Sequence, residues 1–380
     1  MRIAFNESER STLGVEMELM VVDRVSGELV SAGSQLLTEM GRGHPDGEHP
    51  KAKHELLECT VEVITGICET VRDARADLAG TIAELATVAD RHDLSLLSAG
   101  THPLSSWHDQ TVTPAPRYAA LLHDMQWPAQ RLQIFGMHVH VGIRSGEKAI
   151  AIANALTRYL PIFLALSASS PYWEAHDTGL ASARSKVFES LPTAGLPPHL
   201  EDWEDFERFM HTLVHAEAIS TIREVWWDIR PHPDFGTVEL RICDATPTLQ
   251  ETTALAALAQ CLVTWFDRRL DAGEELTFPR DWVMRQNKWL AARYGIDADL
   301  IVDETGARSS TRELVTTVLT ELEPVAVDLD CATELAGIPR ILQTGPSYMR
   351  QRAVVERGGG LADVVHHLVA EFATDAPEAP

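Results

Sequence analysis

The chain has 380 residues, of which 45% are hydrophobic, enough to bury the core of one large domain or two ordinary ones. Its 32 basic residues stand against 56 acidic ones, and the formal charge of -24 argues against a surface that binds nucleic acid or anionic membranes. Any phosphate that the protein binds therefore needs a local basic pocket or a metal ion.

Two features predict a cytoplasmic protein without a membrane segment. The N-terminal residues carry charges where a secretory signal needs an apolar core. The longest apolar stretch, near residues 159–168, is too short to span a bilayer. The five cysteines are scattered and form no CxxC pair, which indicates reduced, buried side chains.

Hydrophobic periodicity predicts short strands separated by amphipathic helices. In chain order we expect strands 13–22 and 57–64, helix 70–92, strands 95–99 and 136–143, helices 147–169 and 201–220, strands 225–229 and 237–242, and helices 248–271, 310–322 and 360–372. Residues 191–200 contain three prolines and should form a loop, while residues 231–236 should form a near-hairpin.

This order of elements predicts an α+β fold in which a mixed or antiparallel sheet is covered by helices on one side. No long linker interrupts the pattern, so we expect a single catalytic domain, residues 1–372. The remaining residues, 373–380, are rich in Ala, Pro and acidic residues and should form a disordered tail.

The first predicted strand carries two acids on one face. Alternate side chains of a strand point the same way, so Glu16 and Glu18 project together, roughly 7 Å apart, while Val15, Met17 and Leu19 pack behind them. Alone, the pattern equally describes a solvated edge strand with an acidic outer face.

The next two polar faces repeat this design. Glu58 and Glu62 alternate with apolar residues, and Glu55 lies just upstream. His138 and His140 form an HxH pair flanked by glycines, which allow close approach by a neighbour or a ligand. Neutral imidazoles suit several divalent metals, although solvated or hydrogen-bonded histidines remain the alternative.

A fourth strand places Glu239 and Arg241 on one face, and Arg230 lies shortly before it. Each could be a simple ion-pair partner. Four polar faces of Glu, His and Arg together indicate more, because clustered carboxylates repel one another unless cations lie between them. We therefore expect a face that binds Mg²⁺, or Mn²⁺, with arginines that stabilise phosphate charge. The chain contains no P-loop or GxGxxG motif.

Several long motifs, in this order, resemble the glutamate-cysteine ligase type 2 family, also called the YbdK-type carboxylate-amine ligases. They are TLGVEMEL, SAGTHPLSSW, RYAALLHDMQWPAQR, FGMHVHVGI, WWDIRPHPDFGTVELRICD and NKWLAARYG. The resemblance runs over residues 11–352. It implies a fold related to glutamine synthetase, in which a curved, mainly antiparallel sheet holds Mg²⁺ and ATP on its concave face and helices cover its back.

The resemblance also implies roles for individual residues and a homodimer. The implied metal ligands are Glu16, Glu18, Glu55, Glu62, His138 and Glu239. The implied catalytic residues are Arg241, Arg230 and Glu62, and the implied ATP contacts are Glu16, Arg241, His140 and Asn287. Arg293 lies in the last motif without a defined role.

The implied reaction joins glutamate to the amine of cysteine through an acyl phosphate, with release of ADP and phosphate. Amino acids would then be the small-molecule substrates. Three alternatives remain open at this point: the same chemistry on another carboxylate and amine, a metal-dependent amidase, and a non-catalytic nucleotide-binding protein.

Overall fold

The computed structural model describes residues 2–377 and is built around a sheet in which every strand pairing is antiparallel. Its strands run in the order β2 (Ala52–His54), β3 (Thr60–Ile64), β1 (Leu13–Asp23), β5 (Met137–Gly142), β9 (Thr237–Leu240) and β8 (Ile229–His232), and β4 (Leu94–Leu97) also pairs with β1. Two small sheets join β6 (Tyr172–Trp173) to β7 (His176–Asp177) and β10 (Asp299–Ile301) to β11 (Arg308–Ser310).

Helices occupy most of the remaining chain. They are α1 (Gly33–Met40), α2 (Val71–Asp90), α3 (Pro116–Met125), α4 (Trp127–Gln130), α5 (Gly146–Leu156), α6 (Leu160–Ser167), α7 (Arg184–Phe188), α8 (Trp203–His215), α9 (Leu249–Asp271), α10 (Asp281–Tyr294), α11 (Thr311–Asp328), α12 (Ala332–Leu335), α13 (Gly337–Thr344), α14 (Ser347–Glu356) and α15 (Leu361–Thr374). Short 3₁₀ helices are Pro45–Gly47, Trp107–Asp109, Thr157–Tyr159, Ile222–Glu224 and Gly295–Asp297.

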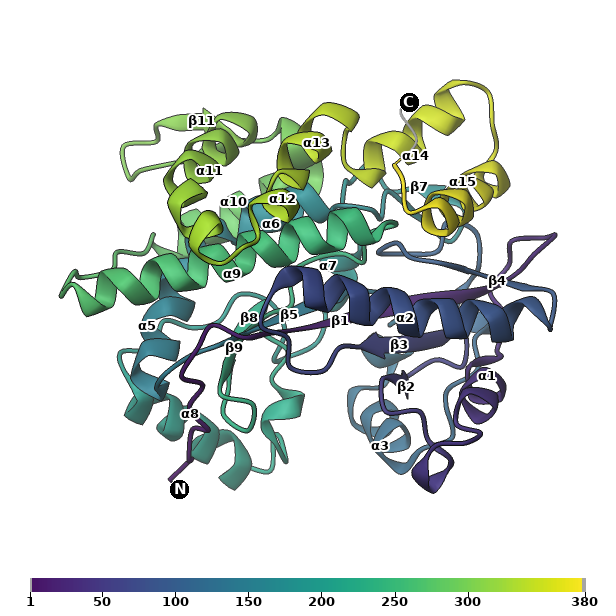
Figure 1. Cartoon of the computed structure of the whole chain (residues 1–380), viewed down its shortest axis with the longest axis horizontal. Coiled ribbons are helices and arrows are strands. Elements are labelled where there is room, and N and C mark those ends of the chain that lie inside the picture. The colour runs from purple at the N-terminus through teal and green to yellow at the C-terminus, as the bar shows by residue number, and fades with distance from the viewer. Residues whose placement is uncertain (1, 378–380) are drawn as a thin grey trace.

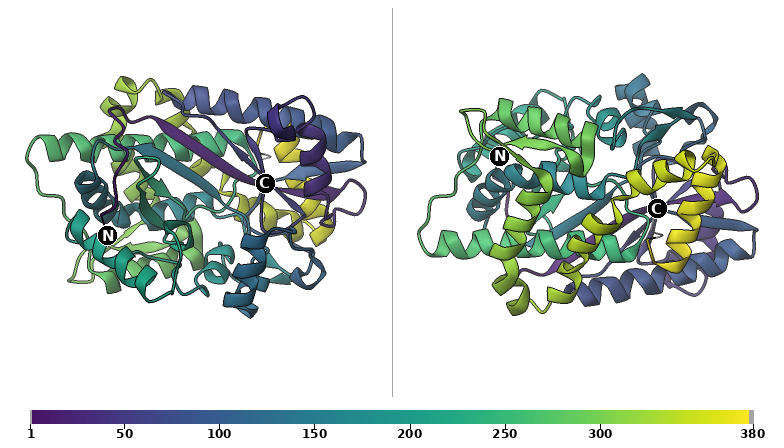
Figure 2. Two further views of the ribbon diagram at one scale, coloured as in Figure 1. Left: turned by 90° about the horizontal axis from the view of Figure 1, so that it is seen from below. Right: turned by 90° about the horizontal axis from the view of Figure 1, so that it is seen from above.

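One face of the sheet is apolar and is covered by α2, α5 and α9. Figure 1 shows α2 and α9 lying along one side of the strands, with the helices α11 to α13 stacked beyond α9. Seen from below, β1 and β5 are open to view, whereas the C-terminal helices lie in front of them from above (Figure 2). Val15, Met17 and Leu19 of β1 are almost completely buried in this core. We call the opposite side, which carries Glu16 and His138, the polar face.

Local sequence explains where the covering helices begin. The hydroxyl of Thr70 accepts a hydrogen bond from the Asp73 amide, and the Asp73 carboxylate accepts one from the Thr70 amide, so both groups cap α2. Thr248 caps α9 in the same way, by accepting from the Glu251 amide. These caps lie within a residue of the expected helix starts.

The prediction of a strand at residues 225–229 is wrong. A 3₁₀ helix, Ile222–Glu224, precedes an extended segment, and the strand begins only at Ile229. The carbonyls of Ile222 and Val225 accept hydrogen bonds from the Arg230 guanidinium, at 2.8 and 2.6 Å, and so are not available to a neighbouring strand. The expected near-hairpin is confirmed, since β8 and β9 pair on either side of residues 233–236.

The expected strand 57–64 begins three residues late, at Thr60, and this changes the position of Glu58. Its carboxylate accepts hydrogen bonds from the amide (3.0 Å) and hydroxyl (2.6 Å) of Ser34 at the start of α1. Glu58 therefore binds a helix N-terminus and does not share the face of Glu62.

Other boundaries also differ from the expectation. The helix expected at 147–169 is interrupted by the 3₁₀ turn Thr157–Tyr159, after which Pro161 occupies the first turn of α6. The stretch from 146 to 167 is long and apolar enough to cross a membrane, but 72% of its apolar window is buried inside the protein, so it is a core element. Eight helices among the described residues were not expected, namely α1, α3, α4, α7, α10, α12, α13 and α14.

The prediction of a disordered tail is wrong for its first residues, 373–375. Helix α15 continues to Thr374, and the carboxylate of Asp375 pairs with Arg75 and accepts a hydrogen bond from the Gln250 amide. These contacts hold the chain end against α2 and α9. Residues 378–380 of that expected tail lie outside the described residues.

Candidate active site

The strand register brings the predicted polar side chains together on the polar face. Burial alternates along β1, so that Glu16 and Glu18 are partly exposed between fully buried neighbours, as expected from the sequence. Neighbouring strands add to the same surface. The paired residues across the strands are Glu18 with Glu62, Glu16 with His138, His140 with Glu239, and Glu239 with Arg230.

Glu16 lies at the centre of this surface, between two imidazoles. One carboxylate oxygen is 2.7 Å from Nδ1 of His138, and the other is 3.3 Å from Nε2 of His140. Burial opposes ionisation of Glu16, but the two histidines outweigh it and hold its pKa below the usual value. The hydroxyl of Thr237, 3.0 Å from Nδ1 of His140, fixes the orientation of that ring.

Glu239 is 1% exposed and lies between two arginines. Nε of Arg230 donates to its carboxylate at 2.7 Å, and Arg241 donates to it from the other side. Burial alone would raise the pKa of Glu239, but Arg241 and Arg230 hold it well below the usual value. The site thus keeps a buried carboxylate charged by placing two cations against it.

Three further acids lie in an opposite electrostatic environment. Burial, followed by repulsion from Glu55, raises the pKa of Glu18 to about 8 and that of Glu62 well above its usual value. Burial also raises the pKa of Glu55. The Gly136 amide donates to Glu18, but this single bond does not offset the loss of water. Such crowded carboxylates favour a bound cation.

The donor atoms on the polar face fit a hard divalent cation. One ligand atom each from Glu16, Glu62 and His138 lie within 4.8 Å of one another, and so do atoms of Glu16, His140 and Glu239. Carboxylate oxygens with an imidazole suit Mg²⁺ or Mn²⁺. The residues present therefore fit the metal that the resemblance implies.

Asn287 is not brought to this surface. Its side-chain amide donates to the Ile301 carbonyl and accepts from the Ile301 amide, each at 2.8 Å, so it binds α10 to β10. Arg293, in the same motif, lies over the ring of Tyr294 at 4.8 Å. The side-chain nitrogen and oxygen of Asn287 are thus both hydrogen-bonded to the Ile301 backbone.

Two buried cations, Arg184 and Lys288, were not predicted as site residues, although Lys288 lies in the NKWLAARYG motif. Arg184, in α7, lies beside Gly136 and affects the charge of Glu18. Lys288, in α10, is 2% exposed and its ammonium lies 2.5 Å from Asp228 and 2.6 Å from Glu189. Neither residue belongs to an alternating strand pattern, and their partners are distant in the sequence.

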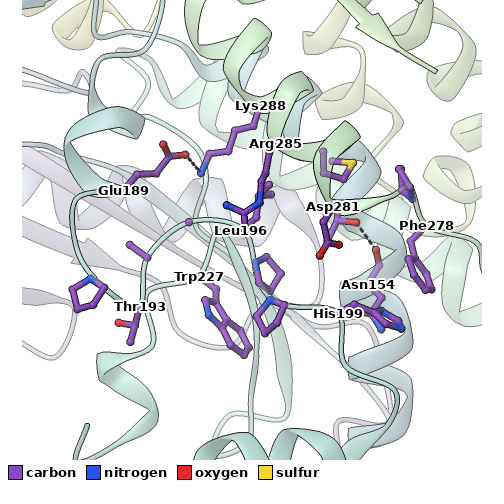
Figure 3. Close-up of a pocket in the computed structure, with 18 of the residues that line it drawn as sticks. Asn154, Glu189, Thr193, Leu196, His199, Trp227, Phe278, Asp281, Arg285 and Lys288 are labelled. Carbon is purple, nitrogen blue, oxygen red and sulfur yellow. Dashed lines mark hydrogen bonds and ion pairs between the residues drawn. The ribbon is translucent and has the colours of Figure 1, made fainter. Parts of the chain in front are cut away.

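Lys288 also lines a cavity of about 610 Å³ between the 189–199 loop, Trp227 and α10 (Figure 3). The figure shows the Lys288 ammonium directed at Glu189, with Trp227 across the cavity. The volume of the cavity is in the range of small-molecule sites. As far as the structure describes its lining, that lining includes none of the acids of the polar face.

Comparison with known proteins identifies the family. The model of glutamate-cysteine ligase family 2 (GCS2) matches residues 12–367. A protein of Frankia alni named "Putative glutamate–cysteine ligase 2-1" is 54% identical over 378 residues, covering 99% of both chains. The chain belongs to glutamate-cysteine ligase family 2. A protein of Thermobifida fusca named "Putative glutamate–cysteine ligase 2" is 51% identical, covering 99% of this chain and 94% of that one.

A solved structure agrees with this assignment at the level of fold. The glutamate–cysteine ligase of Francisella tularensis in complex with AMP superposes with a TM-score of 0.68 over 99% of this chain and 91% of that chain, at 13% identity. The expected α+β fold with a mainly antiparallel sheet is confirmed. As a member of family 2, the protein is an ATP-dependent carboxylate-amine ligase.

Proposed function

We propose that this family 2 ligase joins glutamate to cysteine to form γ-glutamylcysteine. In the first step a glutamate carboxylate oxygen attacks the γ-phosphorus of ATP, and the bond to ADP breaks. In the second, the cysteine nitrogen attacks the acyl phosphate carbon, phosphate leaves and the nitrogen loses a proton. The names of the relatives and the convergence of Glu16, His138, Glu239 and Arg241 on one face support this proposal.

Metal binding is assigned to the acids and the imidazole of the polar face. Mg²⁺ would be held by Glu16, Glu18, Glu55, Glu62, His138 and Glu239. When bound, the metal would neutralise charge on the phosphate oxygens. Glu16, Glu62 and His138 each place a donor atom within 4.8 Å of the other two, and so form the core of the proposed set.

Arg241 is the proposed phosphate-binding arginine. One of its terminal nitrogens pairs with Glu239, while its buried Nε has no hydrogen-bond partner among the residues that the structure describes. A buried donor without an acceptor costs free energy, about 1–3 kcal/mol, unless a ligand supplies one. A phosphate oxygen would supply that acceptor.

Arg230 is proposed as a positioning residue and not as a catalytic one. Its donors are used by the carboxylate of Glu239 and by the carbonyls of Ile222 and Val225. It therefore orients Glu239 and fixes the approach to β8. His140, between Glu16 and Glu239, is a proposed ATP contact. Asn287 would act on ATP only indirectly, since backbone groups occupy its amide.

We further propose that residues 1–372 act as a single catalytic domain in the cytoplasm and that the enzyme is a homodimer. The main core cluster includes residues of the central strands, α2, α9 and α11, which supports the single domain. The homodimer follows only from the resemblance to the family. Sedimentation of the purified protein would measure its oligomeric state.

The test is ADP release with Mg-ATP, glutamate and a panel of amino acids and simple amines, with mass analysis of the product. We expect ADP with glutamate plus cysteine, and loss of that activity in Glu16→Gln. The exposed Glu28→Gln variant is the matched control and should keep wild-type activity. Dependence on another pair would retain the ligase and replace the substrates. No amine-dependent ADP release across the panel would refute the proposal.

A further inference from the structure

Arg184 occupies the polar face although it comes from a helix outside the sheet. It is the first residue of α7 and only 4% exposed. A Cβ added to Gly136 would overlap its guanidinium, at 2.8 Å from Cζ. Residues two apart on a strand share a face, and for this reason a Cβ on Gly136 would project on the same side as His138. The guanidinium therefore lies on the polar face, in space that only glycine leaves open.

The backbone that Arg184 binds is that of Arg241. Strand β9 ends at Leu240, and pairing with the segment that leads into β5 resumes only at Cys243 and Asp244. The Arg241 amide donates instead to the Asp228 carbonyl at 2.8 Å. The Arg241 carbonyl accepts from Nη2 of Arg184 at 3.4 Å, and the Ile242 carbonyl accepts from Nη1 at 3.3 Å. Arg184 thus supplies the donors that the sheet does not.

Arg184 is itself held by a buried polar network. Its amide donates to the hydroxyl of Ser170 at 3.1 Å, and its guanidinium lies 3.9 Å from the carboxylate of Asp244. Asp244 is fully buried and accepts hydrogen bonds from the Ser170 and Ser182 hydroxyls, at 2.6 and 2.9 Å. This network fixes the position of the guanidinium before any substrate binds.

We propose that Arg184 is a positioning residue for phosphoryl transfer: it holds the main chain of Arg241 so that the Arg241 guanidinium is directed at the phosphate site beside Glu239. This inference rests on the proposed binding of Mg-ATP by Arg241. It also assigns a reason to Gly136, since a side chain there would displace Arg184 and leave two carbonyls without donors.

The experiment compares Arg184→Met, Arg184→Lys, Gly136→Ala and the double variant Gly136→Ala/Arg184→Met. Each is measured for Mg-ATP affinity by calorimetry without amino acids, for kcat and the KM of Mg-ATP, and for its thermal midpoint. Arg352→Met is the matched control, because Arg352 also donates to a carbonyl, that of Leu180, but lies partly exposed and outside the polar face.

We expect Arg184→Met to weaken Mg-ATP binding and lower kcat by about 10- to 100-fold, the scale seen when a group that orients a ligand is removed. Arg184→Lys should recover part of the loss, because one ammonium can still reach a carbonyl. Gly136→Ala should resemble Arg184→Met, and the double variant should be no worse than Arg184→Met alone, because both changes remove the same contact.

Mg-ATP affinity and kcat within about 2-fold of wild type in folded Arg184→Met would overturn the proposal. Multiplicative effects in the double variant would also overturn it, because the two residues would then act independently. So would a lower thermal midpoint with unchanged Mg-ATP binding, which indicates a purely structural role. If Arg184→Met does not fold, Arg184→Lys and Gly136→Ala decide by the same criteria. A wild-type enzyme that binds Mg-ATP but makes no γ-glutamylcysteine refutes the substrate proposal alone, because the binding comparison does not depend on the amino acids.

Discussion

Replacing Lys288 by Met should destabilise the protein by about 3–4 kcal/mol, the cost of leaving a buried charge without its partner. The Lys288 ammonium lies 2.5 Å from the carboxylate of Asp228, whose side chain is 5% exposed. Its other partner, Glu189, is 30% exposed and keeps an ion pair with Lys186 at 2.7 Å. The estimate therefore counts the Asp228 pair and adds little for Glu189.

Urea unfolding of wild type and Lys288→Met, monitored by tryptophan fluorescence, measures this difference. The matched variant is Asp228→Asn/Lys288→Met, which removes both charges and should recover stability to within about 1 kcal/mol of wild type, since an uncharged pair needs no counter-ion. A loss below about 1 kcal/mol in the single variant would refute the reasoning, because Asp228 would then have to be solvated or neutral. No recovery of stability in the double variant would refute it as well.

Three other predictions follow from single residues. Glu62→Gln should lower ADP release by about 100-fold or more. Glu58→Gln should leave turnover unchanged and lower the free energy of unfolding by about 1 kcal/mol, the usual contribution of a helix cap. Equal effects of the two variants on turnover would contradict the placement of Glu62, but not Glu58, in the active site. Burial lowers the pKa of His102 to about 4, so below about pH 6.5 the unfolded chain binds a proton that the folded chain does not. Stability should therefore fall by about 3 kcal/mol between pH 6.5 and 4, and the His102→Gln variant should lack this part of the acid dependence in parallel urea titrations. Gly236 has φ of +64°, and a Cβ there would overlap the Asn6 carbonyl. Gly236→Ala should therefore lower the free energy of unfolding by more than about 2 kcal/mol, as measured by thermal unfolding. A variant as stable as wild type would contradict this prediction.

The shared faces of side chains were predictable because alternation is a property of the strand alone. Glu16 with Glu18 and His138 with His140 lie where period two places them, and Arg241, just beyond β9, pairs with Glu239 of that strand. The helix starts at α2 and α9 were predictable for the same reason, since a capping residue acts on an amide three positions away.

Strand boundaries were less predictable where a side chain far away competed for the backbone. Glu58 follows the alternating pattern but binds Ser34, 24 residues earlier. Residues 225–229 have strand-like composition, but the Arg230 side chain takes the carbonyl of Val225. Local periodicity contains neither contact, so it extended both strands too far.

By itself, the sequence determined the family, the two-faced strands and most of the acids, imidazoles and arginines of the polar face. Only the tertiary structure decided the register that pairs Glu16 with His138 and His140 with Glu239. It also placed Arg184 over Gly136, 48 positions earlier in the chain, and Lys288 against Asp228, 60 positions earlier. The physical reason is that periodicity reports which side chains of one element point the same way, whereas the packing of elements against a common core decides which of them meet.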